Sequence, residues 1–158
     1  MKINTLSPDS KVWIYQSNRK FSDSEVTEIT NKGVEFISLW NAHGSMLKAA
    51  VEVLHKQFIV FVVDENQAKA SGCSIDKSVA FIREIQDVFN VVLLDRMQIA
   101  YKNENEINTI PFSEFESLLK SGDLTENTIV FNNLVATKAE FDTSWEAPVK
   151  DSWHKSLL

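Results

Sequence analysis

The strongest constraint in the sequence is an unbroken apolar run, FIVFVV, at residues 58–63. Successive residues of a β-strand point to opposite faces of a sheet, so the run places three apolar side chains on each face. Burying one such side chain is worth about 1.5–3 kcal/mol, so neither face can be left in water without a large loss of stability. The run therefore predicts a central strand of a sheet that is covered on both sides.

Helix and strand signals surround this run. Lys11–Gln16 is rich in β-forming residues and predicts the first strand. Ser22 and Glu25 have the spacing of a capping box and predict the start of a helix, which should end at 41–44. The alternating segment 46–54 predicts a strand that forms a hairpin with 57–64.

A second helix and a further strand follow. Ser74 is a candidate N-cap, and the apolar stripe of this helix consists of Ile75, Val79, Ile82, Ile85 and Phe89. A strand is predicted at 97–101. The resulting order, βαββαβ, predicts an α+β protein with a ferredoxin-like core; another α+β sandwich with the same elements is the alternative.

The rest of the chain predicts a mixed α/β C-terminal extension. It should hold a strand at 106–110, a helix that starts in a second capping box at 113–116 and ends at Gly122, and a strand at 128–131. Both helices of a ferredoxin-like core lie on one face of its sheet. We therefore expect one domain, 1–158, with a core at about 11–102 and an extension at about 103–158. The extension, with its tail tryptophans, or a second subunit in a homodimer, should cover the open sheet face.

Charge and cysteine content exclude some classes of function. The net charge is −6, and no run of basic residues is longer than two, so the electrostatic pattern of a nucleic-acid binder is missing. Anionic membrane surfaces are disfavoured for the same reason, and the run at 58–63 is too short to span a bilayer. The lone Cys73 forms no internal disulfide, which is typical of a reducing compartment. We expect a cytoplasmic protein with no nucleic-acid or membrane partner.

The predicted topology brings the loop after the first helix to the same end of the sheet as the loop before the second. The candidate ligand-binding residues at this end are His43, Asp64, Glu65, Ser71, Gly72, Cys73 and Ser74. Backbone amides at a helix N-terminus bind anions. We therefore predict a site for a small molecule or anion at the edge formed by the 43–45 loop and the 64–74 loop; its cofactor, if any, is unknown.

Two other functions fit the same residues. Cys73 at a helix start can act as a nucleophile or redox thiol with His43 as base, which would make the protein an enzyme. The acidic C-terminal region with Trp145 and Trp153 can instead serve as a protein-interaction module. Against these stand simple structural roles: a cysteine that fills space, a capping serine and solvated polar side chains. No cysteine and histidine spacing is typical of a metal site.

The segment 72–78, GCSIDKS, is superficially similar to a phosphate-binding loop. Such a loop needs a glycine directly before its lysine, where this chain has Asp76, and one more residue than is present. The carboxylate would also repel phosphate. The sequence therefore excludes an ordinary P-loop ATPase.

Several short segments carry a resemblance to a known family. In chain order they are KVWIYQS at 11–17, VDE at 63–65, SGCSIDKS at 71–78, VFNNLV at 130–135, WE at 145–146 and SWH at 152–154. Together they resemble an uncharacterised bacterial family of about this length, whose members are often labelled "ABC transporter ATPase". This chain has neither a complete phosphate-binding loop nor an ABC signature motif, so the resemblance implies a family without implying that activity.

A second resemblance lies near the C-terminus. SGDLT at 121–125 and TIVF at 128–131, after a short helix, resemble part of a GYF-like peptide-binding module. The Gly-Tyr-Phe signature is missing, and no binding residue is carried over from that module.

Overall fold

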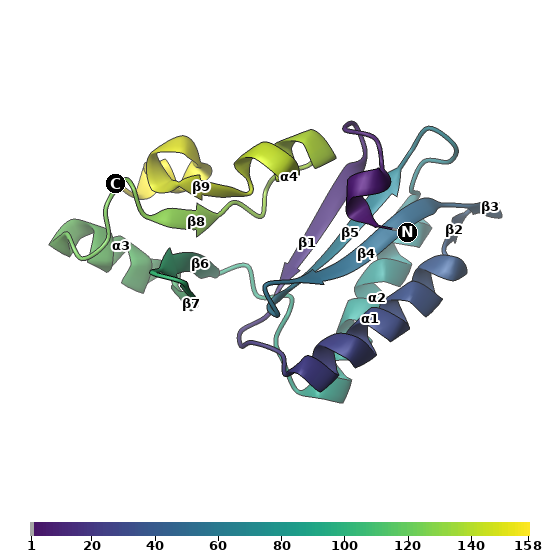
Figure 1. Ribbon diagram of the computed structural model, residues 1–158, viewed down its shortest axis with the longest axis horizontal. Helices are drawn as coiled ribbons and strands as arrows, with labels where there is room; N and C mark the ends of the chain where they lie inside the picture. Colours follow the sequence, from purple (N-terminus) through teal and green to yellow (C-terminus); the bar gives the residue numbers. More distant parts are fainter. Residues whose placement is uncertain (1) are drawn as a thin grey trace. The chain divides into compact units, whose positions relative to one another are not determined.

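The apolar run at the centre of the sequence forms strand β5 (Phe58–Asp64), in which every residue is buried. In the computed structural model, which describes residues 2–158, β5 pairs antiparallel with β1 (Lys11–Gln16) and with β4 (Lys48–Leu54). The sheet order is β1-β5-β4, so β5 is central (Figure 1). The predicted central strand is confirmed, and the protein is a mixed α+β protein with antiparallel sheets.

Helices α1 (Asp23–Ser38) and α2 (Gly72–Phe89) lie on one face of this sheet (Figure 1). Phe36 of α1 and Phe81 of α2 both contact Phe61 of β5, with ring centroids 5.9 and 6.0 Å apart. The capping box that starts α1 is confirmed, because Ser22 accepts a hydrogen bond from the Glu25 amide and Glu25 accepts one from the Ser22 amide.

Two local predictions near these helices are wrong. Ser71, not Ser74, is the N-cap of α2, because the hydroxyls of Ser71 and Ser74 accept hydrogen bonds from each other's backbone amide in a reciprocal box. The segment after α1 forms a separate small hairpin, β2 (Asn41–Ala42) and β3 (Ser45–Met46), before β4 begins at Lys48.

The ferredoxin-like topology is not confirmed. Elements β1 to α2 follow that plan, but the strand predicted at 97–101 does not join their sheet. It forms β6 (Gln98–Asn103), which pairs with β7 (Glu106–Pro111) and β8 (Ile129–Phe131) in a second sheet. The adjacent hairpin strand β7 is a partner that needs only a short loop.

The free edge of β1 is instead met by a short segment from far along the chain. Lys11 forms an isolated antiparallel bridge with Thr137. The Val12 amide donates to the Ala136 carbonyl at 3.0 Å, and the Lys138 amide donates to the Ser10 carbonyl at 2.9 Å. A few residues near 137 thus occupy the position that a fourth strand would take.

The second sheet has the order β7-β6-β8-β9, with β9 at Glu146–Pro148. Helix α3 (Phe112–Ser121) begins directly after Pro111 without a side-chain cap, so the capping box predicted at 113–116 is wrong. Gly122 ends α3 in the left-handed conformation, as predicted. The remaining elements are α4 (Lys138–Ser144) and the 3₁₀ helices η1 (Ile3–Thr5), η2 (Val149–Asp151) and η3 (Trp153–Leu157).

The chain divides into two compact units. Unit 1 contains the residues up to Leu94 together with Ala136–Ala139, and unit 2 contains Asp95–Val135 and Glu140–Leu158. The boundary therefore lies before β6, whereas the core was predicted to extend to about residue 102. That the chain is one domain stays a prediction.

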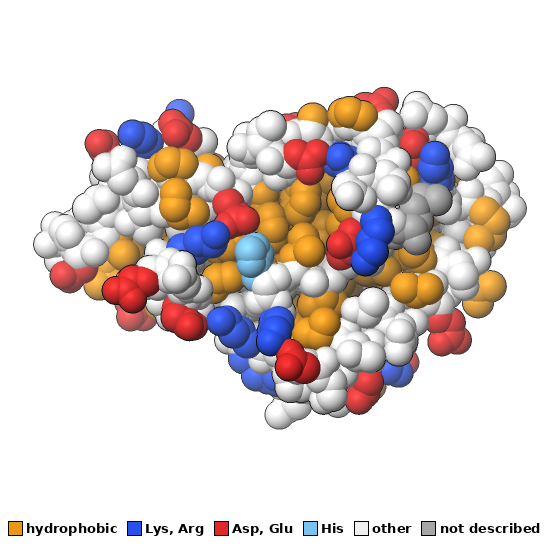
Figure 2. All heavy atoms as spheres, in the orientation of Figure 1, with side chains coloured by type: hydrophobic (Ala, Val, Ile, Leu, Met, Phe, Trp, Pro, Cys, Tyr) orange, Lys and Arg blue, Asp and Glu red, His pale blue; other side chains and the backbone are white. Residues whose placement is uncertain are grey.

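The cover of the sheet's second face also stays a prediction. Figure 2 shows hydrophobic side chains gathered over the strands of unit 1, with charged side chains around them. Within unit 1, the part of the extension that reaches the sheet is Ala136–Ala139, which lies along the edge of β1. Trp145 and Trp153 pack within unit 2, on Phe131 and Phe112 respectively.

Candidate functional site

A buried hydrogen bond connects two segments at the end of unit 1 that carries the predicted site. The Trp40 indole N–H, just after α1, donates to the Ser74 carbonyl in the first turn of α2 at 2.8 Å. Residue 40 immediately precedes the β2–β3 hairpin, whose turn consists of His43 and Gly44, both with positive φ. The turn at 43 and the start of α2 therefore lie at one end of the sheet.

The two carboxylates of this end are engaged by neighbouring backbone. Asp64 is buried and accepts the Asn66 amide at 3.0 Å, and Lys48 lies 3.8 Å away. The backbone hydrogen bond from Asn66 and the charge of Lys48 lower the pKa of Asp64. Glu65 accepts the Ala70 amide at 2.8 Å. Both groups thus fix the 64–70 loop in place.

The hydroxyl pair at the start of α2 is also internally satisfied, because Ser71 and Ser74 hydrogen-bond each other. Gly72, Cys73 and His43 are exposed. Across residues 2–158, no hydrogen bond joins the His43 imidazole to the Cys73 thiol. The structure therefore brings these residues to one edge but shows no nucleophile–base pair there.

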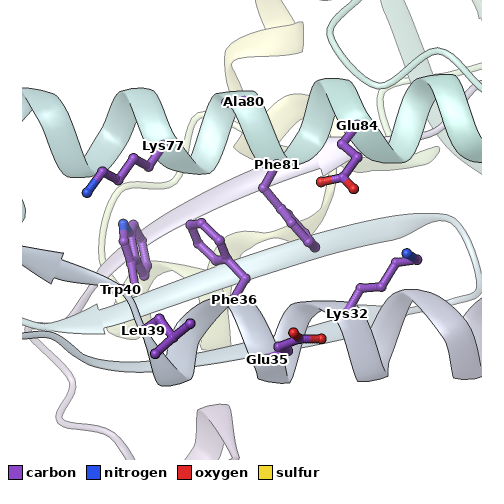
Figure 3. Close-up of a pocket in the computed structure, with 9 residues that line it drawn as sticks. All are labelled: Lys32, Glu35, Phe36, Leu39, Trp40, Lys77, Ala80, Phe81 and Glu84. Atoms are coloured by element: carbon purple, nitrogen blue, oxygen red, sulfur yellow. The ribbon is translucent and has the colours of Figure 1, made fainter.

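A groove that the sequence analysis did not predict begins at this edge. It runs between α1 and α2 and has a volume of about 620 Å³ (Figure 3). Its lining residues come from both helices and from the residues directly after α1: Lys32, Glu35, Phe36, Leu39, Trp40, Lys77, Ala80, Phe81 and Glu84. Ligand pockets in proteins are commonly about 300–1,000 Å³, so the groove has the size of a small-molecule site.

The floor of the groove is aromatic. The Phe36 and Phe81 rings are stacked with centroids 4.9 Å apart, and Trp40 lies 5.2 Å from Phe36. Figure 3 shows these rings standing between the two helices, and Phe61 of β5 contacts all three. A side chain that continues from the core into a groove offers a ligand an apolar face that is already held rigid.

The rim of the groove is charged. It carries Lys32 and Glu35 on α1, and Lys77 and Glu84 on α2. Within the part of the chain that the structure describes, none of these four side chains forms an ion pair or hydrogen bond. Their charges are therefore available to a ligand that lies on the aromatic floor.

Local sequence patterns explain both the groove and why it was missed. Residues 32 and 36 of α1 and its C-cap residue 39 recur at helical spacing, as do 77, 81 and 84 on α2, so each set lies on one side of its helix. Phe36 and Trp40 have the spacing of the buried stripe of an amphipathic helix, so their pattern indicates core residues. Phe81 lies outside the predicted stripe of the second helix. The sequence feature that could have indicated the groove is this aromatic residue between the charged residues Lys77 and Glu84.

The tail tryptophans pack against residues of unit 2. Trp145 is buried, stacks on Phe141 and donates its indole N–H to Asn133. Trp153 stacks on Phe112 and on His154. These contacts lie within unit 2 and use the faces of both indoles.

Comparisons with protein-family models, with curated proteins and with solved structures found no match to this chain. Among residues 2–158, no helix has the length and apolar character needed to cross a bilayer. The same residues contain no group of three or more histidine, cysteine or acidic side chains arranged to hold a metal ion.

Proposed function

We propose that this protein is a binding module for a small molecule with an apolar body and that the ligand lies in the groove between α1 and α2. The observation that carries the proposal is the aromatic floor of Phe36, Trp40 and Phe81 beneath a charged rim. The proposal keeps the predicted class of function. It moves the site from the loops into the adjoining groove, which the Trp40–Ser74 hydrogen bond links to the predicted edge.

Exposed apolar surface at the rim supports the same function. Leu39 lines the groove with 73% of its surface exposed, next to the partly buried Phe36. A ligand that covers Leu39 and the exposed part of Phe36 removes apolar surface from water, which is worth about 25 cal/mol per Å². The helices would need little rearrangement, because the rings already rest on Phe61 of the sheet.

The test uses N-phenyl-1-naphthylamine, an uncharged dye that fluoresces in apolar sites. We expect the wild-type protein to raise the dye's emission and the dye to quench tryptophan fluorescence. Leu39→Glu should weaken binding by about tenfold or more, because it replaces an apolar contact with a charge.

Val34→Glu is the matched control. Val34 is also on α1, is 51% exposed and does not line the groove, so this variant should bind the dye as the wild type does. On the opposite wall, Ala80→Glu should weaken binding, and Val88→Glu, also on α2 but outside the groove, should not. Absence of dye binding by the wild type, or equal loss in groove and control variants, would refute the proposal.

The resemblance to an uncharacterised bacterial family and the cytoplasmic location stay proposals beside this one. The single cysteine supports the location, because it is typical of a reducing compartment.

A further inference from the structure

We infer that the ligand of the α1–α2 groove is an aromatic anion, bound with its rings on Phe36 and Phe81 and its negative charge at Lys77. This inference rests on the proposed function and adds the chemical class and the orientation of the ligand. It follows from the way in which the two helices distribute their charges along the groove.

The helices run antiparallel, so the groove has two different ends. Trp40, after the end of α1, is hydrogen-bonded to Ser74 in the first turn of α2. Lys77 therefore lies at the Trp40 end, whereas Lys32 and Glu84 lie at the other, as Figure 3 shows. From residue 77 to residue 84 the helix rises about 10 Å, which is the length of a compound of two rings with a charged substituent.

The two ends differ in charge. Lys77 is the charged lining residue at the Trp40 end, while Glu35 and Glu84 outnumber Lys32 towards the other end. Asp76, the acidic neighbour of Lys77 on α2, is not among the lining residues. An anionic group is therefore attracted at the Trp40 end and repelled at the far end, and this fixes the direction of the ligand.

Helix dipoles do not supply this polarity. The negative end of α1 and the positive end of α2 meet at the Trp40 end, so their fields there oppose each other. The preference depends on the Lys77 side chain, which is exposed. An ion pair at such an exposed site changes an affinity only a few-fold. We therefore expect Lys77 to contribute about threefold to the affinity for an anion.

The experiment compares two dyes on the full-length protein. 1-Anilinonaphthalene-8-sulfonate has the ring system of N-phenyl-1-naphthylamine and adds a sulfonate. The measured quantity is the ratio of their affinities, which cancels effects that a substitution has on the shape of the groove. Lys77→Gln should lower the sulfonate-to-neutral ratio about threefold, and Lys77→Glu should lower it further.

Lys32→Gln is the matched control, because Lys32 is a lysine at the other end of the same groove. A sulfonate at Lys77 would lie about one Debye length from it at physiological salt, so this variant should leave the ratio nearly unchanged. A ratio that is insensitive to Lys77, or lowered more by Lys32→Gln, overturns the inference while the proposed function stands. If the neutral dye itself does not bind, the proposed function fails instead.

Discussion

At the scale of single residues, the environment of His154 in η3 changes its pKa. Its side chain is only 1% exposed, its ring stacks on Trp153 at 3.9 Å, and Phe115 contacts it edge-on. Its Nδ1 atom hydrogen-bonds the Ser152 hydroxyl at 2.8 Å. Burial among aromatic rings penalises the charged imidazolium and lowers the pKa of His154 from 6.5 to about 4.

This pKa predicts that unit 2 loses stability in mild acid. Between pH 6.5 and about 4, the unfolded chain takes up a proton on His154 that the folded chain does not. The contribution of neutral His154 is therefore present above pH 6.5 and is lost as the pH falls through 4. The difference in pKa corresponds to about 3 kcal/mol. Urea unfolding, followed by tryptophan fluorescence from pH 7.5 to pH 4, measures the loss.

His154→Phe provides the comparison, because it keeps an aromatic ring and has no group to protonate. The part of the acid sensitivity that belongs to His154 should be absent from this variant, whatever its stability at neutral pH. An NMR titration of the imidazole proton signals gives the pKa directly. A midpoint near 6.5 in the folded protein would contradict the prediction.

Local signals at the residue scale were predictable where their partners lie nearby in the sequence. The Ser22–Glu25 box was found because both halves follow a known pattern over four residues. The Ser71–Ser74 box was missed because a serine takes the place usually held by glutamate or glutamine. The burial of His154 could not be predicted from local sequence, because Phe115, which packs on it, lies far from it in the sequence.

At the scale of elements, the packing of α1 on β4 depends on Gly33. A Cβ atom at this position would lie 2.9 Å from a Cγ atom of the buried Val51. The sequence marks Gly33 as a mild defect inside a helix, since glycine costs about 1 kcal/mol relative to alanine there. In the structure, this cost is offset by the close approach of α1 to β4, which the absence of a Cβ atom at Gly33 allows.

Gly33→Ala should therefore destabilise unit 1 in spite of its higher helix propensity. The overlap with Val51 should cost about 1–3 kcal/mol, which outweighs the gain in propensity. The free energy of unfolding in urea measures the effect. In a Val51→Ala background, the same substitution should be neutral or stabilising, because the clashing methyl groups are gone.

Gly72→Ala is the matched control for this prediction. A Cβ atom at Gly72, in the first turn of α2, would meet no atom within 4 Å. We expect that variant to be at least as stable as the wild type. Equal effects at Gly33 and Gly72, or an unchanged cost in the Val51→Ala background, would show that the close approach does not control α1.

The element that completes the first sheet could not be predicted from its own sequence. The β-forming pattern of Gln98–Asn103 correctly indicates a strand, but such a pattern does not determine which strand it pairs with. The hairpin with β7 supplied a local partner, and β1 was left with Thr137, which contributes a single bridge. So short a segment carries no alternating pattern, and its place depends on the path of the chain between the two units.

At the scale of the whole molecule, the chain crosses between its units three times. It leaves unit 1 after Leu94, returns for Ala136–Ala139, and ends in unit 2. Unit 2 is therefore discontinuous in sequence, and neither unit can be separated by a single cut without loss of residues. The return segment begins α4 at Lys138 while it holds the edge of β1.

This crossing predicts that one backbone N–H contributes measurably to the stability of unit 1. Lys138→Pro removes the donor to the Ser10 carbonyl, and Ser10 is 1% exposed. Proline suits the first residue of a helix, and the bridged Thr137 before it has the extended backbone that precedes proline, so α4 should persist. An unpaired buried carbonyl costs about 1–3 kcal/mol.

Lys138→Ala is the control, because it also removes the lysine side chain but keeps the backbone N–H. The proline variant should therefore be less stable than the alanine variant by about 1–3 kcal/mol. The Val12 amide hydrogen should also exchange with solvent faster in the proline variant than in the alanine variant. Equal stability of the two variants would mean that the return segment does not stabilise the sheet.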